Sequence, residues 1–74
     1  MAKPGIHTVP HGGRWANERD GASRVSAVFD KQSDAIAAAK RTAQREGLEQ
    51  FIHGEDGAIR ERNAYGNDSA SRPG

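Results

Sequence analysis

Three histidines are the residues best suited to chemistry, and their spacing tests for a metal site. His7 and His11 lie four apart, which on a helix would put two metal ligands on one face. Pro10 and the Gly12-Gly13 pair exclude a helix here, and along a strand this spacing is about 13 Å, too far to chelate one ion. His53 would join them only through the fold. We therefore predict no metal site and no other cofactor.

Catalytic groups are equally hard to find. Glu55-Asp56 is a carboxylate pair, but it lies on a predicted turn, where solvent should keep both pKa values near normal. The sequence holds no serine or cysteine nucleophile motif, no phosphate-binding loop and no dinucleotide fingerprint. A chain of 74 residues also leaves little room for a ligand-sized pocket. We predict no catalytic residues and expect that the protein is not an enzyme.

A third kind of chemistry is recognition by cations and aromatic rings. The candidate binding residues are Arg14, Trp15, Arg24, Arg60, Arg62 and Tyr65. If the strands bring the arginines together, the open face of a sheet becomes a cationic strip that contacts phosphates, and the aromatic rings stack on bases. The alternatives are that Trp15 is a core residue, that Tyr65 anchors the chain end, and that Glu18, Asp20 and Glu61 neutralise the face.

The elements that position these residues are short. Alternating and apolar segments predict strands at 6–10, 14–19, 23–29, 48–53 and 58–63. Gly12-Gly13, Asp20-Gly21 and Asp56-Gly57 supply the positive φ angles of tight reversals, so we expect antiparallel pairs. Within 23–29, Val25 and Phe29 should face one way and Arg24 and Val28 the other.

One segment has helical periodicity. Residues 31–46 predict an amphipathic helix with an alanine-rich face that allows close packing on a sheet. Asp30 or Ser33 should cap its start, and Gly47 suits the left-handed position after its last turn, with Leu48 folding back. The prediction is an α+β fold: a small antiparallel sheet of three strands, then the helix, then one or two more strands, with the helix packed on one face.

Size and composition set the limits. The chain should form a single domain over 6–65, with flexible ends at 1–5 and 66–74. Eleven basic and ten acidic residues give a net charge of +1, so overall charge favours no polyanionic partner. Without cysteine, a disulfide is impossible; with no apolar run of about 20 residues we expect no membrane association, and a cytoplasmic location. The predicted core residues are Ile6, Val9, Trp15, Val25, Val28, Phe29, Ile36, Leu48, Phe51, Ile52 and Ile59.

Several segments together resemble a known family. They are the stretches 12–16, 28–30, 35–39 and 53–57, and above all the segment from Ile59 through Tyr65 to Asp68. The chain resembles domain of unknown function 2188, a family of small bacterial and phage proteins, over about 7–68. Asn17 departs from it, because the family often has valine there. The resemblance implies the same element order but no activity and no site residues.

Two functions from different classes remain open. The first is a nucleic-acid-binding accessory module that uses the open sheet face, which a weaker topological similarity to three-stranded integrase DNA-binding domains also suggests. The second is a protein-interaction module, either a homodimer or an inhibitor of a host protein, that pairs a partner with an exposed strand edge.

Overall fold

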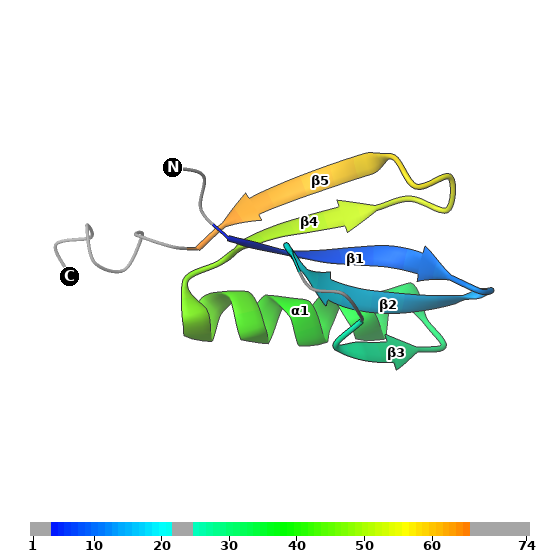
Figure 1. Cartoon of the computed structure of the whole chain (residues 1–74), viewed down its shortest axis with the longest axis horizontal. Coiled ribbons are helices and arrows are strands. Elements are labelled where there is room, and N and C mark those ends of the chain that lie inside the picture. The colour runs from blue at the N-terminus through cyan, green and yellow to red at the C-terminus, as the bar shows by residue number, and fades with distance from the viewer. Residues whose placement is uncertain (1–3, 22–24, 66–74) are drawn as a thin grey trace, which may run out of the picture.

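One helix lies along a five-stranded sheet in the computed structural model, which describes residues 4–21 and 25–65 (Figure 1). The elements are β1 (Gly5–His11), β2 (Arg14–Arg19), β3 (Ala27–Phe29), α1 (Gln32–Glu46), β4 (Glu49–His53) and β5 (Ile59–Ala64). The helix packs against β1, β2, β3 and β4. The predicted α+β class and the order of strands and helix are confirmed. Of the predicted flexible ends 1–5 and 66–74, residues 1–3 and 66–74 lie outside the described residues, and Gly5 is the first residue of β1.

The sheet is mixed, with the strand order β3-β2-β1-β4-β5. β1 and β4 are parallel, and the other neighbouring pairs are antiparallel. The prediction of a fully antiparallel sheet is therefore wrong at this central pair. Each element runs opposite to the one before it, and the helix counts as one of these elements. β1 and β3 therefore run one way, β2 and α1 run the other way, and β4 runs in the same direction as β1. β4 pairs with the edge of β1 that β2 does not occupy.

The tight reversals differ from one another. Gly12 (φ 57°) and Gly13 (φ 83°) close the β1–β2 hairpin, and Gly57 (φ 87°) lies in the β4–β5 turn, as predicted. At the Asp20-Gly21 turn, the Asp20 N–H donates to the Gly5 carbonyl (2.9 Å). Of the predicted strand 23–29, Ala27–Phe29 forms β3, residues 25 and 26 are outside the strand, and residues 23 and 24 lie outside the described residues.

The C-terminal end of α1 agrees with the prediction from sequence, and the N-terminal end does not. Gly47 adopts the left-handed conformation (φ 72°, ψ 38°), and its N–H donates to the Ala43 carbonyl, as expected of a helix C-terminus. The N-cap residue is Lys31, without a side-chain cap, so the predicted cap from Asp30 or Ser33 is wrong. The Asp30 carboxylate instead accepts a hydrogen bond from Arg14 Nε at 2.7 Å.

The core between sheet and helix is built on small side chains. Ala35, Ala39 and Ala43 recur every four residues on α1 and are fully buried. The larger buried residues are Ile6, Leu48 and Ile52. Of the other predicted core residues described, Val9, Trp15, Val25, Val28, Phe29, Ile36 and Phe51 are half-buried, and Ile59 is 55% exposed. The prediction for Ile59 is wrong because β5 is an edge strand that the helix does not cover.

Polar side chains complete this covered face. Thr8 Oγ1 donates to Asn17 Oδ1 (2.6 Å), and Asn17 Nδ2 donates to the Ala35 carbonyl (2.9 Å). Gln50 Nε2 donates to the Ile36 carbonyl at 3.1 Å. Among the described residues, no buried side-chain nitrogen or oxygen lacks a partner. Two strand amides therefore fix the first turns of the helix in register on the sheet.

Candidate functional site

The face of the sheet away from the helix, here called the open face, carries a ring cluster. The parallel register places Gly5 beside Glu49 and His7 beside Phe51, so odd-numbered residues of β1 and β4 share this face. The His7 and Phe51 rings are stacked, with centroids 4.6 Å apart and planes 15° from parallel. Phe51 also lies across Gly5, where an added Cβ would meet its ring at 2.7 Å. Gly5 therefore gives Phe51 the space to cover the strand.

The second histidine of the cluster comes from β4. His7 Nδ1 and His53 Nε2 are 2.9 Å apart, although the two residues are 46 positions apart in sequence. The outer nitrogens are also engaged: His7 Nε2 lies 2.7 Å from Asp20 Oδ1, and His53 Nδ1 lies 2.8 Å from the Gly57 carbonyl. A continuous chain of hydrogen bonds therefore runs from the Asp20 carboxylate to the β4–β5 turn. We call these four residues the histidine chain.

Sequence reasoning missed this constellation. The spacing of His7 and His11 is a within-strand spacing, and it correctly predicts that these two share no ion. The relevant neighbour is His53, which the parallel pairing of β1 and β4 brings beside β1. Counting the chain reversals, three strands and then a helix, could have predicted that β4 runs parallel to β1, but not that the two strands are neighbours.

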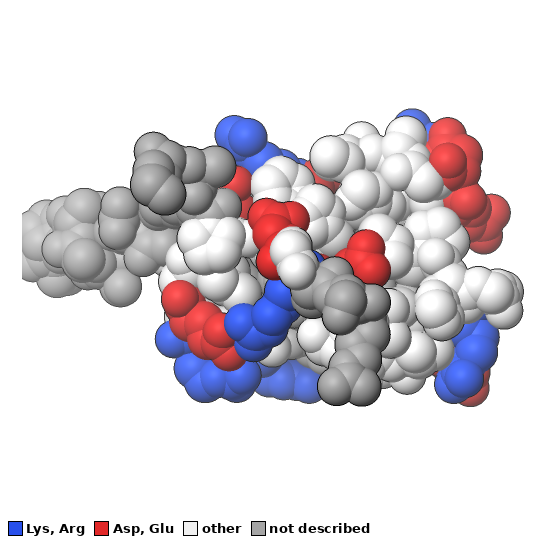
Figure 2. Space-filling model, in the orientation of Figure 1, with Lys and Arg blue, Asp and Glu red and all other residues white. Residues whose placement is uncertain are grey.

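Two of the predicted arginines are held in ion pairs. Arg14 Nε pairs with Asp30 at 2.7 Å, and Arg60 pairs with Asp56 at 3.0 Å. Arg62 is exposed on β5 directly opposite Phe51, and therefore on the open face. Figure 2 shows acidic and basic side chains interspersed on one side of the molecule. Arg24, the remaining predicted arginine, lies outside the described residues.

The two predicted aromatic residues lie on the covered face. Trp15 is half-buried and shares the face of Asn17, two residues further along β2. Tyr65 packs against the core cluster around Ile6, and its hydroxyl donates to Gln50 Oε1 at 3.3 Å. The described part of the predicted binding set is therefore divided between two faces and does not form one surface.

A small hollow opens at the hairpin end of the sheet. It measures about 250 Å³ and is lined by Pro10, Gly13, Arg14, Trp15 and Glu55. Ligand pockets generally exceed roughly 300 Å³ and close over much of the ligand. In the described part of the chain, no group of three or more His, Cys, Asp or Glu is arranged to hold a metal ion.

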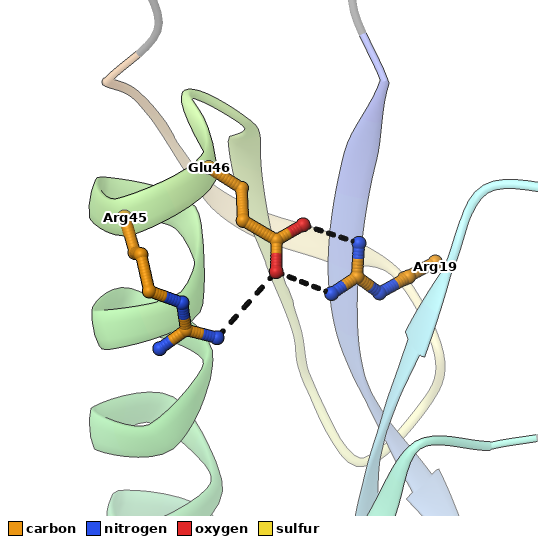
Figure 3. Close-up of polar contacts among 3 residues, drawn as sticks. All are labelled: Arg19, Arg45 and Glu46. Carbon is orange, nitrogen blue, oxygen red and sulfur yellow. Dashed lines mark hydrogen bonds and ion pairs between the residues drawn. The ribbon is translucent and has the colours of Figure 1, made fainter.

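Ionised groups elsewhere serve the fold. The Arg19 guanidinium donates to both carboxylate oxygens of Glu46 (2.6 and 2.7 Å), and Arg45 approaches the same carboxylate at 3.4 Å (Figure 3). The hydrogen bonds between the two side chains lower the pKa of Glu46 and raise the pKa of Arg19, because they stabilise both charged forms. This contact ties the end of β2 to the end of α1.

The turn carboxylate departs from its expected behaviour. The pKa of Asp56 is lowered, chiefly because its side chain accepts a hydrogen bond from the Ala58 N–H, with the charge of Arg60 adding to the effect. The prediction of a near-normal pKa is wrong for this residue. A lowered pKa keeps the group ionised at neutral pH, which suits a turn constraint better than a general acid.

Comparison with known proteins gives a family without an assigned activity. A family model described as "Uncharacterized protein conserved in bacteria (DUF2188)" matches residues 6–65. The "Uncharacterized protein YdaT" of Bacillus subtilis (strain 168) is 36% identical over 56 residues, which cover 76% of this chain and 37% of that protein. No solved structure matches. Within the described residues, no helix has the length and apolar character to cross a membrane.

Proposed function

The chain belongs to the DUF2188 family of uncharacterised bacterial proteins, and from its geometry we propose that it is a non-enzymatic protein-interaction module that binds an extended segment of another protein along β5. The single observation that carries this proposal is the exposed edge of β5. Among the strands described, β5 pairs only with β4, and five of its six residues are exposed.

The backbone of β5 is oriented for pairing. The Tyr65 N–H donates to the Leu48 carbonyl, which makes Ala64 and Glu49 a pair that exchanges no hydrogen bonds. Along an antiparallel ladder such pairs alternate, so the N–H and C=O groups of Ala64 and Arg62 point away from β4. No other described strand pairs with them, so they can receive a strand from a partner, the binding mode known as β-augmentation.

The other edge is less suited to this role. β3 has three residues, too few for an extended ladder, whereas β5 has six. Ile59, the most exposed large apolar residue described, stands at the start of β5. An apolar contact there and a ladder beyond it would together define a partner segment.

The charges of β5 favour a different protein over a second copy. A two-fold axis perpendicular to the sheet pairs residues of the same face, and the two longest registers then centre on Glu61 or on Arg62. Either register places like charges directly opposite each other, which destabilises the pair. We infer a partner whose extended segment carries a carboxylate opposite Arg62. We propose that the two proteins meet in the cytoplasm.

Ala64→Pro tests this proposal. Proline removes an N–H that faces away from β4, so the sheet keeps its internal hydrogen bonds. With a photo-crosslinking amino acid in place of Ile59, we expect a discrete adduct with one other protein in cells of the source bacterium. Adding Ala64→Pro should reduce the adduct about tenfold or more, and Ala64→Ser should not. An adduct of unchanged yield in the Ala64→Pro protein would contradict the proposal.

A second candidate function rests on a separate observation. Arg62 lies beside the stacked Phe51 and His7 rings on the open face, and a cation next to aromatic rings suits single-stranded nucleic acid. Fluorescence anisotropy with labelled DNA and RNA at about 50 mM salt tests it, because phosphate contacts are strongest at low salt. Binding that falls with salt and with Arg62→Ala supports this function, and no binding at 50 mM excludes it.

A further inference from the structure

The histidine chain contains more hydrogen bonds than two neutral histidines and an ionised aspartate can supply. The Gly57 carbonyl only accepts, so His53 Nδ1 carries a hydrogen. The ionised Asp20 carboxylate also only accepts, so His7 Nε2 carries another. The inner nitrogens, His7 Nδ1 and His53 Nε2, then need one hydrogen between them. Three hydrogens on four ring nitrogens are one more than two neutral imidazoles carry.

This count does not depend on where the extra proton sits. If Asp20 is protonated and donates to His7 Nε2, then His7 Nδ1–H donates to His53, and the total is unchanged. Without the extra proton, two nitrogen lone pairs would face each other at 2.9 Å. We propose that His7 and His53, with Asp20, form a binding site for one shared proton, whose loss opens the contact between the two rings.

Charged groups from several elements favour or disfavour binding of this proton. The elements around the pair carry these titratable or charged groups: Glu18 of β2, Asp20, His11 of β1, Glu49 of β4, Glu55 and Asp56 of the β4–β5 turn, and Arg60 and Arg62 of β5. Glu18 is directly opposite His7, and its negative charge favours the extra proton. The positive charge of Arg62, which lies across from Phe51 on β5, disfavours the extra proton. The charge of Arg60 is paired with Asp56.

The stacked ring is a further favourable contact. Phe51 lies face to face with His7 at 4.6 Å between centroids. A positively charged imidazole gains from the negative face of an aromatic ring at such a distance. The His7 side chain is 22% exposed, so it is shielded from water more than a surface histidine is.

A divalent metal ion is the competing occupant. Metal-bound histidines hold their outer nitrogens by hydrogen bonds, as His7 and His53 do. However, no third histidine, cysteine or carboxylate within the described residues completes a metal site. The inner nitrogens also lie at an ordinary N–H···N distance. These observations favour the proton.

The shared proton has a structural consequence. The chain joins β1, the residue after β2, the end of β4 and the turn that leads into β5. When the proton is bound, Gly57 is held to the sheet through His53. The link between His7 on β1 and His53 at the end of β4 therefore depends on pH.

The sign of the pH effect follows from the proton counts. Counted relative to neutral rings, the unfolded chain carries two extra protons on these histidines at low pH, whereas the folded pair carries one. At high pH the unfolded chain carries no extra proton, whereas the folded pair still holds one. The stability contributed by the pair therefore rises and then falls with increasing pH, with a maximum where the folded pair and the unfolded chain carry the same number of protons. On each side the unfolding equilibrium constant changes by up to about tenfold per pH unit.

Urea unfolding of the whole chain from pH 5 to pH 9 tests this expectation. We expect His7→Gln and His53→Gln each to remove the maximum, and His11→Gln, an exposed histidine on the same strand, to retain it. A His7→Gln profile that parallels the wild type would overturn the proposal.

A second measurement needs no variant. Nitrogen-15 NMR of the wild-type histidines should show two coupled titration steps separated by a plateau with three ring N–H hydrogens in the pair. Independent titration of His7 and His53 to two neutral rings would overturn the shared proton. Both experiments are repeated in EDTA and with one equivalent of Zn²⁺. An unchanged profile in EDTA supports the proton, whereas a plateau that appears only with Zn²⁺ assigns the site to the metal.

Discussion

The two faces of the sheet are held by different kinds of polar contact. On the covered face, Thr8, Asn17 and Gln50 hydrogen-bond one another or helix carbonyls through hydroxyl and amide groups. On the open face, His7 and His53 are joined by groups that gain and lose protons. The first set keeps its donors and acceptors at every physiological pH, whereas the second keeps them only over part of the range. The difference separates a scaffold from a surface that can respond to its surroundings.

The largest expected effect comes from the closest packing on the covered face. Ala39 is fully buried where α1 meets the sheet, so Ala39→Leu adds atoms that have no space. We expect a loss of about 3 kcal/mol in the free energy of unfolding, a large share of the stability of a domain this small. Ala37→Leu, the same change on the exposed side of the helix, should shift the value by no more than about 0.5 kcal/mol. Urea unfolding measures both, and equal losses would contradict the assignment of the faces.

A smaller loss is expected from the polar layer. Asn17→Ala removes the acceptor of the Thr8 hydroxyl and the donor to the Ala35 carbonyl, both in a buried setting. The expected loss is about 2 kcal/mol. Because neither amide nor hydroxyl titrates, the loss should be the same at pH 5.5 and pH 8. A loss that varies between these two pH values would break the comparison between the faces.

Local sequence signals predicted the scaffold well. The helix, the left-handed Gly47, the return of Leu48 to the core and the Gly12-Gly13 hairpin each depend on a few neighbouring residues with strong conformational preferences. The helix start was predicted less well, because Asp30 is used by Arg14, which lies far away in sequence. A competing tertiary contact of that kind leaves no local signal.

The candidate site was largely beyond local reasoning. The prediction weighed His7 and Phe51 separately, as a strand histidine and a core residue, but they form one stack because β1 and β4 are parallel neighbours. Predicting an antiparallel sheet removed that pairing from consideration. Trp15 and Tyr65 are candidate binding residues by residue type, with a core position for Trp15 and an anchoring role for Tyr65 as the alternatives. The register and the core contacts place both on the covered face, in agreement with those alternatives.

The smallest expected effect concerns an ionised contact at the margin of the two faces. Glu46→Gln weakens the pairing with Arg19, but it also removes a negative charge from the last turn of α1, where the helix dipole disfavours anions. The contact is exposed, so we expect the thermal midpoint at pH 7 to fall by only about 1 to 2 °C. Hydrogen bonding to Arg19 lowers the pKa of Glu46, so its stabilisation is present above the unfolded value of about 4.3 and is lost as the pH falls through the lower folded value. Thermal unfolding at pH 7 and at about pH 2.5 should show the wild type and the variant converging in acid. On its alkaline side the histidine chain changes in the opposite direction, losing stability as the pH rises, so one pH series separates the two ionised contacts.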